Sequence, residues 1–310
     1  MNKLLVILGP TASGKTDISI KLALRLCSGQ AKKFGVHGAE IVSADSRQVY
    51  KGMDIGSGKV TKKEMKGIPH YLLDVANPKR KFTVAQYQKL ALKAIKNIQK
   101  RNKLPILVGG TGFYIRSVVD GIVIPEVKPD WKLRKKLEKL SNEQLFEKIK
   151  NLDPKRAESI DAHNPRRLIR ALEIVLKTGH PIPLLIRGCR THADFTVMEI
   201  GIKKSKDELK KNIRKRLLKR LKNNVMIKEV KKLRASGLSW KRLEEFGLEY
   251  RFVAQYLQNK IAFQKMVDMI QLESEHFVKK QLTWFKKDKR IKWLDDYKET
   301  ESSIDKFVTK

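Results

Sequence analysis

The sequence has few cysteines and few acidic residues, and it contains no long hydrophobic segment. Only two of its 310 residues are cysteines, Cys27 and Cys189, and they stand far apart in no metal-ligand spacing. The pair supports neither a disulfide framework nor a zinc module. The apolar run closest to the start, Leu4 to Leu8, is far too short for a membrane span or a signal-peptide core. We therefore expect a cytoplasmic protein that does not contact a membrane.

Basic residues outnumber acidic residues two to one. The sequence contains 68 Lys and Arg residues against 33 Asp and Glu residues, which gives a formal net charge of +35. Self-repulsion on this scale disfavours a compact chain unless a polyanionic partner neutralises it. The excess favours a nucleic-acid partner. A general bias toward lysine, with no binding groove, is the alternative interpretation.

The first part of the chain alternates between short apolar strands and helical segments. The pattern predicts strands at 3–8, 39–42 and 105–108 and helices at 15–27 and 83–100. Turns that contain glycine or small polar residues follow the strands, as is typical of a parallel sheet that binds ligands at the carboxyl ends of its strands. We predict an α/β fold with a P-loop NTPase-like parallel sheet.

Prolines interrupt the chain after this region. They separate helical pieces at about 130–140, 141–150, 154–161 and 165–178. Residues 195–202 have the pattern of a returning strand, and basic helices follow it to about residue 286. We therefore expect a core domain of residues 1–122 plus 195–310 that carries an inserted all-helical domain, residues 123–194.

A phosphate-binding pattern, G-x-x-x-x-G-K-[ST], follows the first predicted strand as Gly9-Pro10-Thr11-Ala12-Ser13-Gly14-Lys15-Thr16. Glycines let the backbone direct its N–H groups at phosphate oxygens, and the next helix adds its positive end. Lys15 would give a point charge to a phosphate, and Thr16 a hydroxyl to Mg²⁺. An ordinary strand-to-helix turn is the alternative, but the strand before it and the helix after it favour a phosphate site.

Polar segments also follow the second and third predicted strands. The second strand runs into Ser43-Ala44-Asp45-Ser46-Arg47-Gln48, which a doubly wound sheet would place beside the phosphate-binding segment. Asp45 could bind Mg²⁺ through water or accept a proton from a nucleophile; a helix-capping role is the alternative. The third strand opens into Gly109-Gly110-Thr111-Gly112, where the glycines allow close approach of a ligand and Thr111 offers a hydroxyl.

These motifs occur together in the order typical of one enzyme family. They are Gly9–Thr16, Asp45–Tyr50, Gly52–Gly56, Ile68–His70 with Leu72–Asp74, Val108–Gly112, Asn164–Arg167 with Arg170–Glu173, Thr178–Gly179, and Gln281–Phe285. Over about residues 3–286 the sequence resembles the bacterial tRNA dimethylallyltransferase (tRNA isopentenyltransferase) family.

The resemblance implies transfer of a dimethylallyl group from dimethylallyl diphosphate to N6 of the adenosine immediately 3′ of the tRNA anticodon. It places the diphosphate and Mg²⁺ on residues 9–16, with Thr11 close to the bridging oxygen. Asp45 matches the general base that accepts a hydrogen bond from the N6 amine. Arg216, in the basic segment 209–222, matches an arginine that lines the channel to the diphosphate. From its residues alone this segment is also consistent with a solvated amphipathic helix.

The resemblance also implies contacts with the anticodon stem-loop of tRNA. The implied residues are Asp45, Ser46, Arg47, Gln48, Thr111, Arg166, Arg167, Leu168, Ile169 and Arg170. We expect the helical insertion to clamp the stem through its phosphates and the target adenosine to flip out of its stack. Nothing in the sequence demands more than a monomer.

The sequence departs from the family pattern at a few positions. The family's Gly-Thr-Ala-Lys-Pro is Gly56-Ser57-Gly58-Lys59-Val60 here, and Asn212 stands where arginine is frequent. The usual Gly-Tyr of a later segment is Gly247-Leu248, followed by Glu249, and Glu275 replaces another frequent arginine.

Two other classes of function remain as alternatives. A small-molecule kinase would share the phosphate-binding loop and the sheet, but it leaves the net charge of +35 unexplained. A non-catalytic RNA-binding protein would account for the charge, but not for the joint presence of Lys15, Thr16 and Asp45.

Overall fold

Within the described residues, six strands form one parallel sheet in the order β3-β2-β4-β1-β5-β6. The computed structural model describes residues 2–28, 37–122, 124–125, 127–182, 195–295 and 297–309. The strands are β1 (Lys3–Leu8), β2 (Ala39–Ala44), β3 (His70–Tyr71), β4 (Leu104–Gly109), β5 (Thr196–Ile202) and β6 (Lys292–Leu294). The predicted α/β class with a parallel sheet is confirmed.

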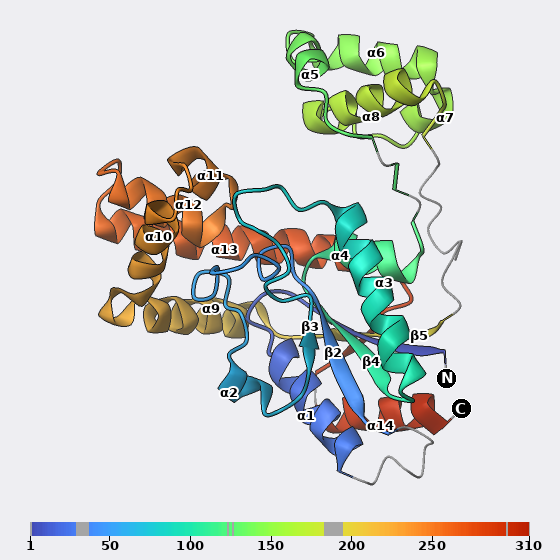
Figure 1. The fold of residues 1–310 in the computed structure, drawn as a ribbon, viewed down its shortest axis with the longest axis vertical. Helices are drawn as coiled ribbons and strands as arrows, with labels where there is room; N and C mark the ends of the chain where they lie inside the picture. The colour runs from blue at the N-terminus through green and yellow to red at the C-terminus, as the bar shows by residue number, and fades with distance from the viewer. Residues whose placement is uncertain are drawn as a thin grey trace. The chain divides into compact units, whose positions relative to one another are not determined.

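The chain divides into two compact units. The larger unit comprises Met1–Val119 and Asp194–Lys310, and the smaller comprises Asp120–Ala193. Besides the sheet, the larger unit contains α1 (Lys15–Cys27), α2 (Lys62–Met65), α3 (Val84–Lys100), α4 (Gly112–Val119), α9 (Lys206–Leu221), η2 (Lys222–Asn224), α10 (Val225–Ala235), α11 (Trp240–Glu245), α12 (Leu248–Leu257), α13 (Phe263–Lys286) and α14 (Tyr297–Thr309) (Figure 1).

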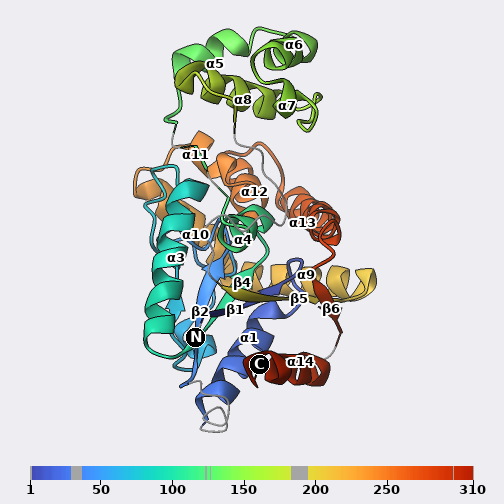
Figure 2. The ribbon, with the colours of Figure 1, turned by 90° about the vertical axis from the view of Figure 1, so that its right-hand side faces the viewer.

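Helices cover both faces of the sheet (Figure 2). α1 and α14 share one apolar cluster with side chains of β1, β2, β4 and β5, and α3 packs against β2 and β4. The central strand β1 lies between β4 and β5, and residues 4–8 within it are fully buried. A nearly continuous apolar strand is typical of a parallel sheet that is covered on both sides.

The smaller unit is helical throughout its described part. Its helices are α5 (Trp131–Leu137), α6 (Asn142–Leu152), α7 (Pro154–Ala157) and α8 (Pro165–Thr178). They enclose an apolar core that includes Leu145, Leu168 and Leu172. Arg134 and Arg170 both form ion pairs with the carboxylate of Glu173, which is completely buried.

The structure lengthens some predicted elements and adds others. β2 and β4 extend one or two residues beyond the predicted ends, to Ala44 and Gly109. The strands β3 and β6 and the helix α14 were not predicted, because β3 and β6 are too short to show a hydrophobic period and α14 is rich in charged and polar residues.

A buried carboxylate ties β2 to β3 and to the short segment that joins α3 to β4. Both oxygens of Glu40 on β2 accept hydrogen bonds, from Arg101, Lys103 and Tyr71 of β3. Burial opposes ionisation of Glu40, but these donors outweigh it and lower the pKa to about 2. The network therefore stabilises the fold only while this carboxylate is ionised.

We predict that Glu40→Gln lowers the free energy of unfolding by about 2 kcal/mol at pH 7, because it leaves two cations without their carboxylate. The pKa of Glu40 in the folded state lies below its ordinary value of 4.5. The wild-type protein therefore has its full extra stability over Glu40→Gln above pH 4.5 and loses it as the pH falls toward 2. Urea unfolding at pH 7 and pH 3 measures it, with Glu147→Gln at an exposed position as the control. If Glu40→Gln lost the same free energy of unfolding at both pH values, the lowered pKa of Glu40 would be contradicted.

Candidate functional site

Three loops meet at the carboxyl edge of the sheet because three strands end in register. Leu8 of β1 and Ala44 of β2 are each paired with Gly109 of β4. The segment Gly9–Thr16, here called the phosphate loop, and the turn that begins at Asp45 therefore leave the sheet at the same level, on either side of β4. The polar segments that were predicted after the strands share one edge.

The phosphate loop carries a half-buried lysine and an unpaired hydroxyl. The Lys15 Nζ donates a hydrogen bond of 3.1 Å to the carbonyl of Pro10. Burial, and next the charge of Arg216, lower the pKa of Lys15 to about 8, while the charge of Asp45 opposes the shift. The Ser13 hydroxyl is buried and has no hydrogen-bond partner among the described residues. The loop thus offers a cation and a free donor to an anion.

The Asp45 carboxylate is oriented by its own turn. Its Oδ1 accepts hydrogen bonds from the N–H groups of Arg47 at 2.8 Å and Gln48 at 3.1 Å. No hydrogen bond reaches Oδ2 from any residue that the structure describes. The Thr111 hydroxyl accepts a hydrogen bond of 3.1 Å from the Ser46 N–H and so fixes the same turn from the end of β4. One carboxylate oxygen is held in place and the other stays available to a ligand.

The side chains of Arg47 and Gln48 hold neighbouring segments. Arg47 Nε donates a hydrogen bond of 2.6 Å to the carbonyl of Phe246, and Gln48 Nε2 donates one of 3.2 Å to the carbonyl of Gly58. Both side chains are half-buried. The Arg47 contact connects the Asp45 turn to the helical part of the larger unit, and the Gln48 contact connects it to the loop that contains Gly58.

Gln281 of α13 joins two of the loops. Its Oε1 accepts a hydrogen bond of 2.8 Å from the Thr11 N–H, and its Nε2 donates one of 2.8 Å to the carbonyl of Gly110. A Cβ at Gly110 would lie 2.4 Å from this Nε2, so only glycine leaves room for the amide. The segment Gln281–Phe285 was one of the motifs on which the family resemblance rests, but no role for Gln281 was predicted from the sequence.

A cavity beside the phosphate loop has a mixed apolar and basic lining. It is lined by Thr11, Ala12, Ile213, Arg216, Leu217, Arg220, Glu249, Ile270 and Ser274. Arg216 makes no hydrogen bond or ion pair with the described residues. Burial, and next the charge of Arg220, lower the pKa of Arg216 to about 10. Asn212, on the same helix, donates a hydrogen bond of 3.3 Å to the carbonyl of Ala12 and so links α9 to the phosphate loop.

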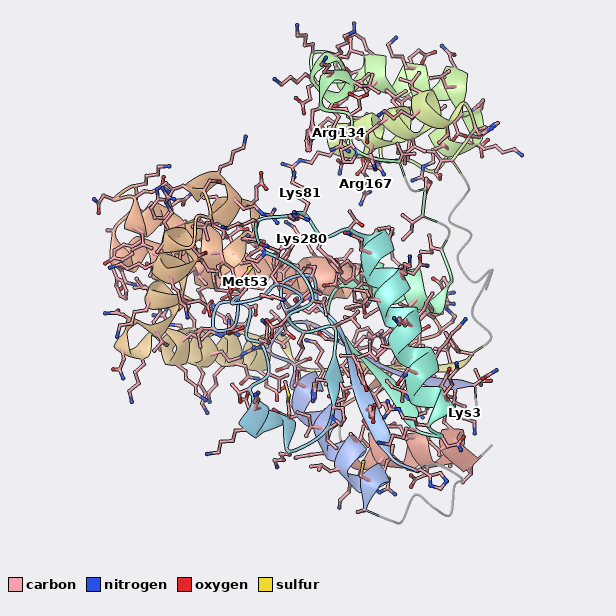
Figure 3. The ribbon with its side chains drawn as sticks, in the orientation of Figure 1. Lys3, Met53, Lys81, Arg134, Arg167 and Lys280 are labelled. Atoms are coloured by element: carbon pink, nitrogen blue, oxygen red, sulfur yellow. The ribbon has the colours of Figure 1, made fainter. Side chains whose placement is uncertain are left out.

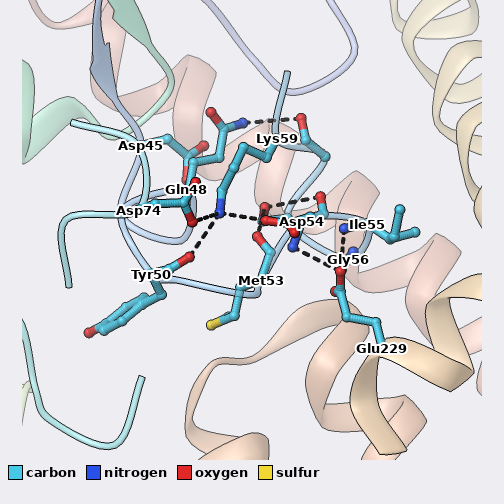
Figure 4. Close-up of polar contacts among 12 residues, drawn as sticks. Asp45, Gln48, Tyr50, Met53, Asp54, Ile55, Gly56, Lys59, Asp74 and Glu229 are labelled. Carbon is cyan, nitrogen blue, oxygen red and sulfur yellow. Dashed lines mark hydrogen bonds and ion pairs between the residues drawn. The ribbon is translucent and has the colours of Figure 1, made fainter. Parts of the chain in front are cut away.

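Residues 52–60 form a loop that two charged side chains hold from opposite sides (Figure 4). Lys59 Nζ contacts the carboxylates of Asp54 at 2.7 Å and Asp74 at 2.6 Å. On the other side, Glu229 of α10 accepts hydrogen bonds from the backbone N–H groups of residues 54, 55 and 56. Sequence reasoning missed Glu229, because its partners are backbone groups about 175 residues away.

In the smaller unit, the predicted tRNA-binding residues of α8 divide into two groups. The side chains of Leu168 and Ile169 belong to its apolar core, and the contact of these two residues with tRNA stays a prediction. Arg170 is half-buried against Glu173. Arg166 and Arg167 are exposed, and Figure 3 shows Arg167 among the side chains of this unit. These two are the exposed arginines of the predicted segment 166–170, and Arg167 lies 3.5 Å from the carboxylate of Asp161.

A protein-family model described as IPP transferase matches residues 48–288. The chain belongs to the IPP transferase family. A tRNA dimethylallyltransferase of Thermoanaerobacter sp. (strain X514) is 38% identical over 308 residues, which cover 96% of this chain and 94% of that protein. A tRNA dimethylallyltransferase of Carboxydothermus hydrogenoformans is 38% identical over 313 residues, covering 99% and 96%.

Solved structures of similar proteins share the fold. The full-length tRNA isopentenylpyrophosphate transferase of Bacillus halodurans is 33% identical, with a TM-score of 0.70 and coverage of 99% of this chain and 96% of that one. A eukaryotic dimethylallyltransferase acting on tRNA has a TM-score of 0.77 at 23% identity, covering 95% and 74%. At that identity the likeness concerns the fold alone.

The described residues of this IPP transferase family member contain no group of three or more His, Cys, Asp or Glu side chains suited to hold a metal ion. Oxygen donors at the sheet edge include the Thr16 hydroxyl, in the first turn of α1, and the Asp45 carboxylate. None of the helices in the described ranges is long and apolar enough to cross a membrane.

We predict that Gln281→Met lowers the free energy of unfolding by about 1–3 kcal/mol. The thioether cannot replace either hydrogen bond, so the Thr11 N–H and the Gly110 carbonyl lose their partner. Gln264→Met, at an exposed position of the same helix, is the matched control. Urea unfolding of both variants tests the prediction, and equal stabilities would show that the bridge contributes nothing.

Proposed function

We propose that the chain transfers a dimethylallyl group from dimethylallyl diphosphate to N6 of the adenosine immediately 3′ of the anticodon in tRNA. The observation that carries the proposal is the meeting, at one sheet edge, of the phosphate loop with the oriented carboxylate of Asp45. The names of its relatives and the net charge of +35 support a tRNA acceptor.

The cavity beside the phosphate loop has the chemistry that a prenyl diphosphate needs. Lys15 and Arg216 supply positive charge for the diphosphate, and Ser13 supplies an unpaired hydroxyl. Ile213, Leu217 and Ile270 form apolar lining for a five-carbon chain. Thr11 lies in the same lining, where its hydroxyl would approach the bridging oxygen. These cations stabilise the negative charge that develops on the leaving diphosphate.

The oxygen donors of the site fit Mg²⁺, which takes few protein ligands and shares substrate phosphates and water. The Thr16 hydroxyl is a suitable ligand, and the Asp45 carboxylate could contribute through water. Bound there, Mg²⁺ would neutralise charge on the diphosphate. The role of Thr16 in this proposal is to hold the ion in the first turn of α1.

Asp45 would receive the acceptor amine. An exocyclic adenine amine is a weak nucleophile, so its orientation and the removal of its proton matter. Oδ1 is occupied by the two backbone N–H groups of its own turn, which fixes the carboxylate, and Oδ2 is then the oxygen that accepts the N6 proton. Thr111 and Ser46 keep this turn in place.

Residues of each unit would separately contribute contacts to the anticodon stem-loop. Arg166 and Arg167 are exposed cations of the smaller unit, and Ser46, Arg47 and Gln48 lie beside Asp45, where the flipped adenosine enters. Phosphate contacts of this kind make binding steeply salt-dependent. Because one chain supplies Thr11, Asp45 and Arg216, the proposal needs only a monomer. The proposed tRNA substrate supports a cytoplasmic location.

The decisive test is mass analysis of nucleosides from unmodified tRNA incubated with the protein, Mg²⁺ and dimethylallyl diphosphate. We expect N6-(dimethylallyl)adenosine, and we expect Asp45→Asn to lower kcat about 10²–10⁴-fold while tRNA and diphosphate still bind. Asp268→Asn, at an exposed position, is the matched control. Turnover by Asp45→Asn at the wild-type rate would remove Asp45 from the mechanism.

The same preparation separates the rival functions. ATP would protect a kinase against thermal unfolding, whereas dimethylallyl diphosphate protects a prenyltransferase. Tight tRNA binding without any prenylated nucleoside, or protection by ATP alone, would overturn the proposal.

The pH dependence of donor binding should report on Lys15. Its pKa of about 8 means that the free protein loses this charge as the pH rises above 8. We predict that the KM for dimethylallyl diphosphate rises by up to tenfold per pH unit above that point, because a bound diphosphate favours the protonated lysine. The arginine of Lys15→Arg stays charged in this pH range. The variant should therefore show no such rise of KM with pH, even if its KM differs from that of the wild-type protein at every pH. Identical pH profiles for the two proteins would refute the assignment.

A further inference from the structure

A second arginine lines the donor cavity one helical turn after Arg216. Arg220 and Arg216 stand four residues apart on α9, a spacing at which like charges repel. Both line the cavity that also contains Thr11 and Ala12 of the phosphate loop. The Arg220 side chain is only 15% exposed, and its charge contributes to the lowered pKa of Arg216. Such an arrangement is unfavourable unless an anion compensates it.

The protein supplies only part of that compensation. Arg220 Nη1 lies 2.9 Å from Glu249 Oε1 and donates a hydrogen bond of 3.3 Å to the carbonyl of Gly56. Arg216 has no such partner within the described residues. Glu249 is therefore the one carboxylate that pairs directly with either guanidinium group among the described residues. Asp17 and Asp45 act on Arg216 without an ion pair or hydrogen bond, and Lys15 adds a third cation to the same region.

Space for the two guanidinium groups comes from a missing side chain. A Cβ at Gly58 would lie 2.0 Å from Arg220 Nη2 and 2.7 Å from Arg216 Nη2, and the φ of Gly58 is +61°. The family pattern Gly-Thr-Ala-Lys-Pro has alanine at the position of Gly58. The loop that contains Gly58 is held in place by Glu229 and Lys59, so the glycine directly faces both arginines.

We propose that Arg220 is a second guanidinium that binds the diphosphate of the donor, and that Glu249 pairs with it when no donor is bound. This assignment rests on the proposed function. A diphosphate carries several negative charges and accepts parallel hydrogen bonds from guanidinium groups. It would relieve the repulsion between Arg216 and Arg220, and it competes with Glu249 for Arg220.

The proposal predicts opposite effects for the two members of the ion pair. The probe is inorganic diphosphate with Mg²⁺, and its Kd is measured by titration calorimetry. Arg220→Met removes the binding cation and should weaken binding at least tenfold, the loss expected for a hydrogen bond between charged groups. Glu249→Gln removes the competing charge but keeps an oxygen acceptor, so it should strengthen binding several-fold. In prenylation assays Arg220→Met should raise the KM for the donor and leave the KM for tRNA unchanged.

Lys219→Met is the matched control, because it removes an exposed charge from the adjacent position of the same helix. Arg220→Gln, which keeps polar atoms at this position, serves if the methionine variant does not fold. A purely structural ion pair would weaken binding in both Arg220→Met and Glu249→Gln, and that result overturns the proposal. So does wild-type affinity in Arg220→Met, or an effect confined to the KM for tRNA. If the wild-type protein binds diphosphate and prenylates tRNA, such results refute only the role of Arg220; if it does neither, the proposed function itself fails.

Discussion

The candidate site depends on the register of three parallel strands. Leu8 and Ala44 are both paired with Gly109, so the neighbouring strands β1, β4 and β2 end at the same level of the sheet. A shift of the pairing by one residue would also exchange the side chains of β4 between the two helix-covered faces of the sheet. The buried apolar residues of these strands therefore fix the position of the phosphate loop and of Asp45. Gln281 connects the loops that follow β1 and β4 through an amide whose two ends are both used.

The positive charges gathered at the carboxyl edge of the sheet repel one another and so destabilise the protein when no anion is bound. Burial lowers the pKa values of Lys15 and Arg216. Repulsion by Arg216 adds to the shift of Lys15, and repulsion by Arg220 adds to that of Arg216, whereas a bound anion would oppose both shifts. The surrounding helices keep the cations in place, since α9 is linked to the phosphate loop through Asn212. The site is thus preorganised for a polyanion, and the binding of that anion would stabilise the fold.

The sequence predicted those parts of the site that lie next to one another in the chain. The phosphate loop was predicted from its glycines, lysine and threonine, because these residues act through local backbone geometry. Asp45 followed from its place after an apolar strand. Leu168 and Ile169 were assigned to tRNA contact through the family resemblance of residues 166–170, and the assignment did not consider that the helical period of α8 points their side chains into the apolar core. Contacts between distant segments, such as those of Glu229 with the backbone of residues 54–56, leave no pattern in the neighbouring sequence from which they could be predicted.

The departures from the family pattern acquire a physical meaning only in three dimensions. In the sequence, Gly58 and Glu249 are unrelated changes separated by almost two hundred residues. In the structure, both contact Arg220, because Gly58 leaves room for its guanidinium and Glu249 balances its charge. A side chain at position 58 would force the guanidinium group of Arg220 to move, and without Glu249 this group would have no carboxylate partner among the described residues. The three residues therefore form one unit of the donor cavity, and a change at any one of them alters the requirement on the other two.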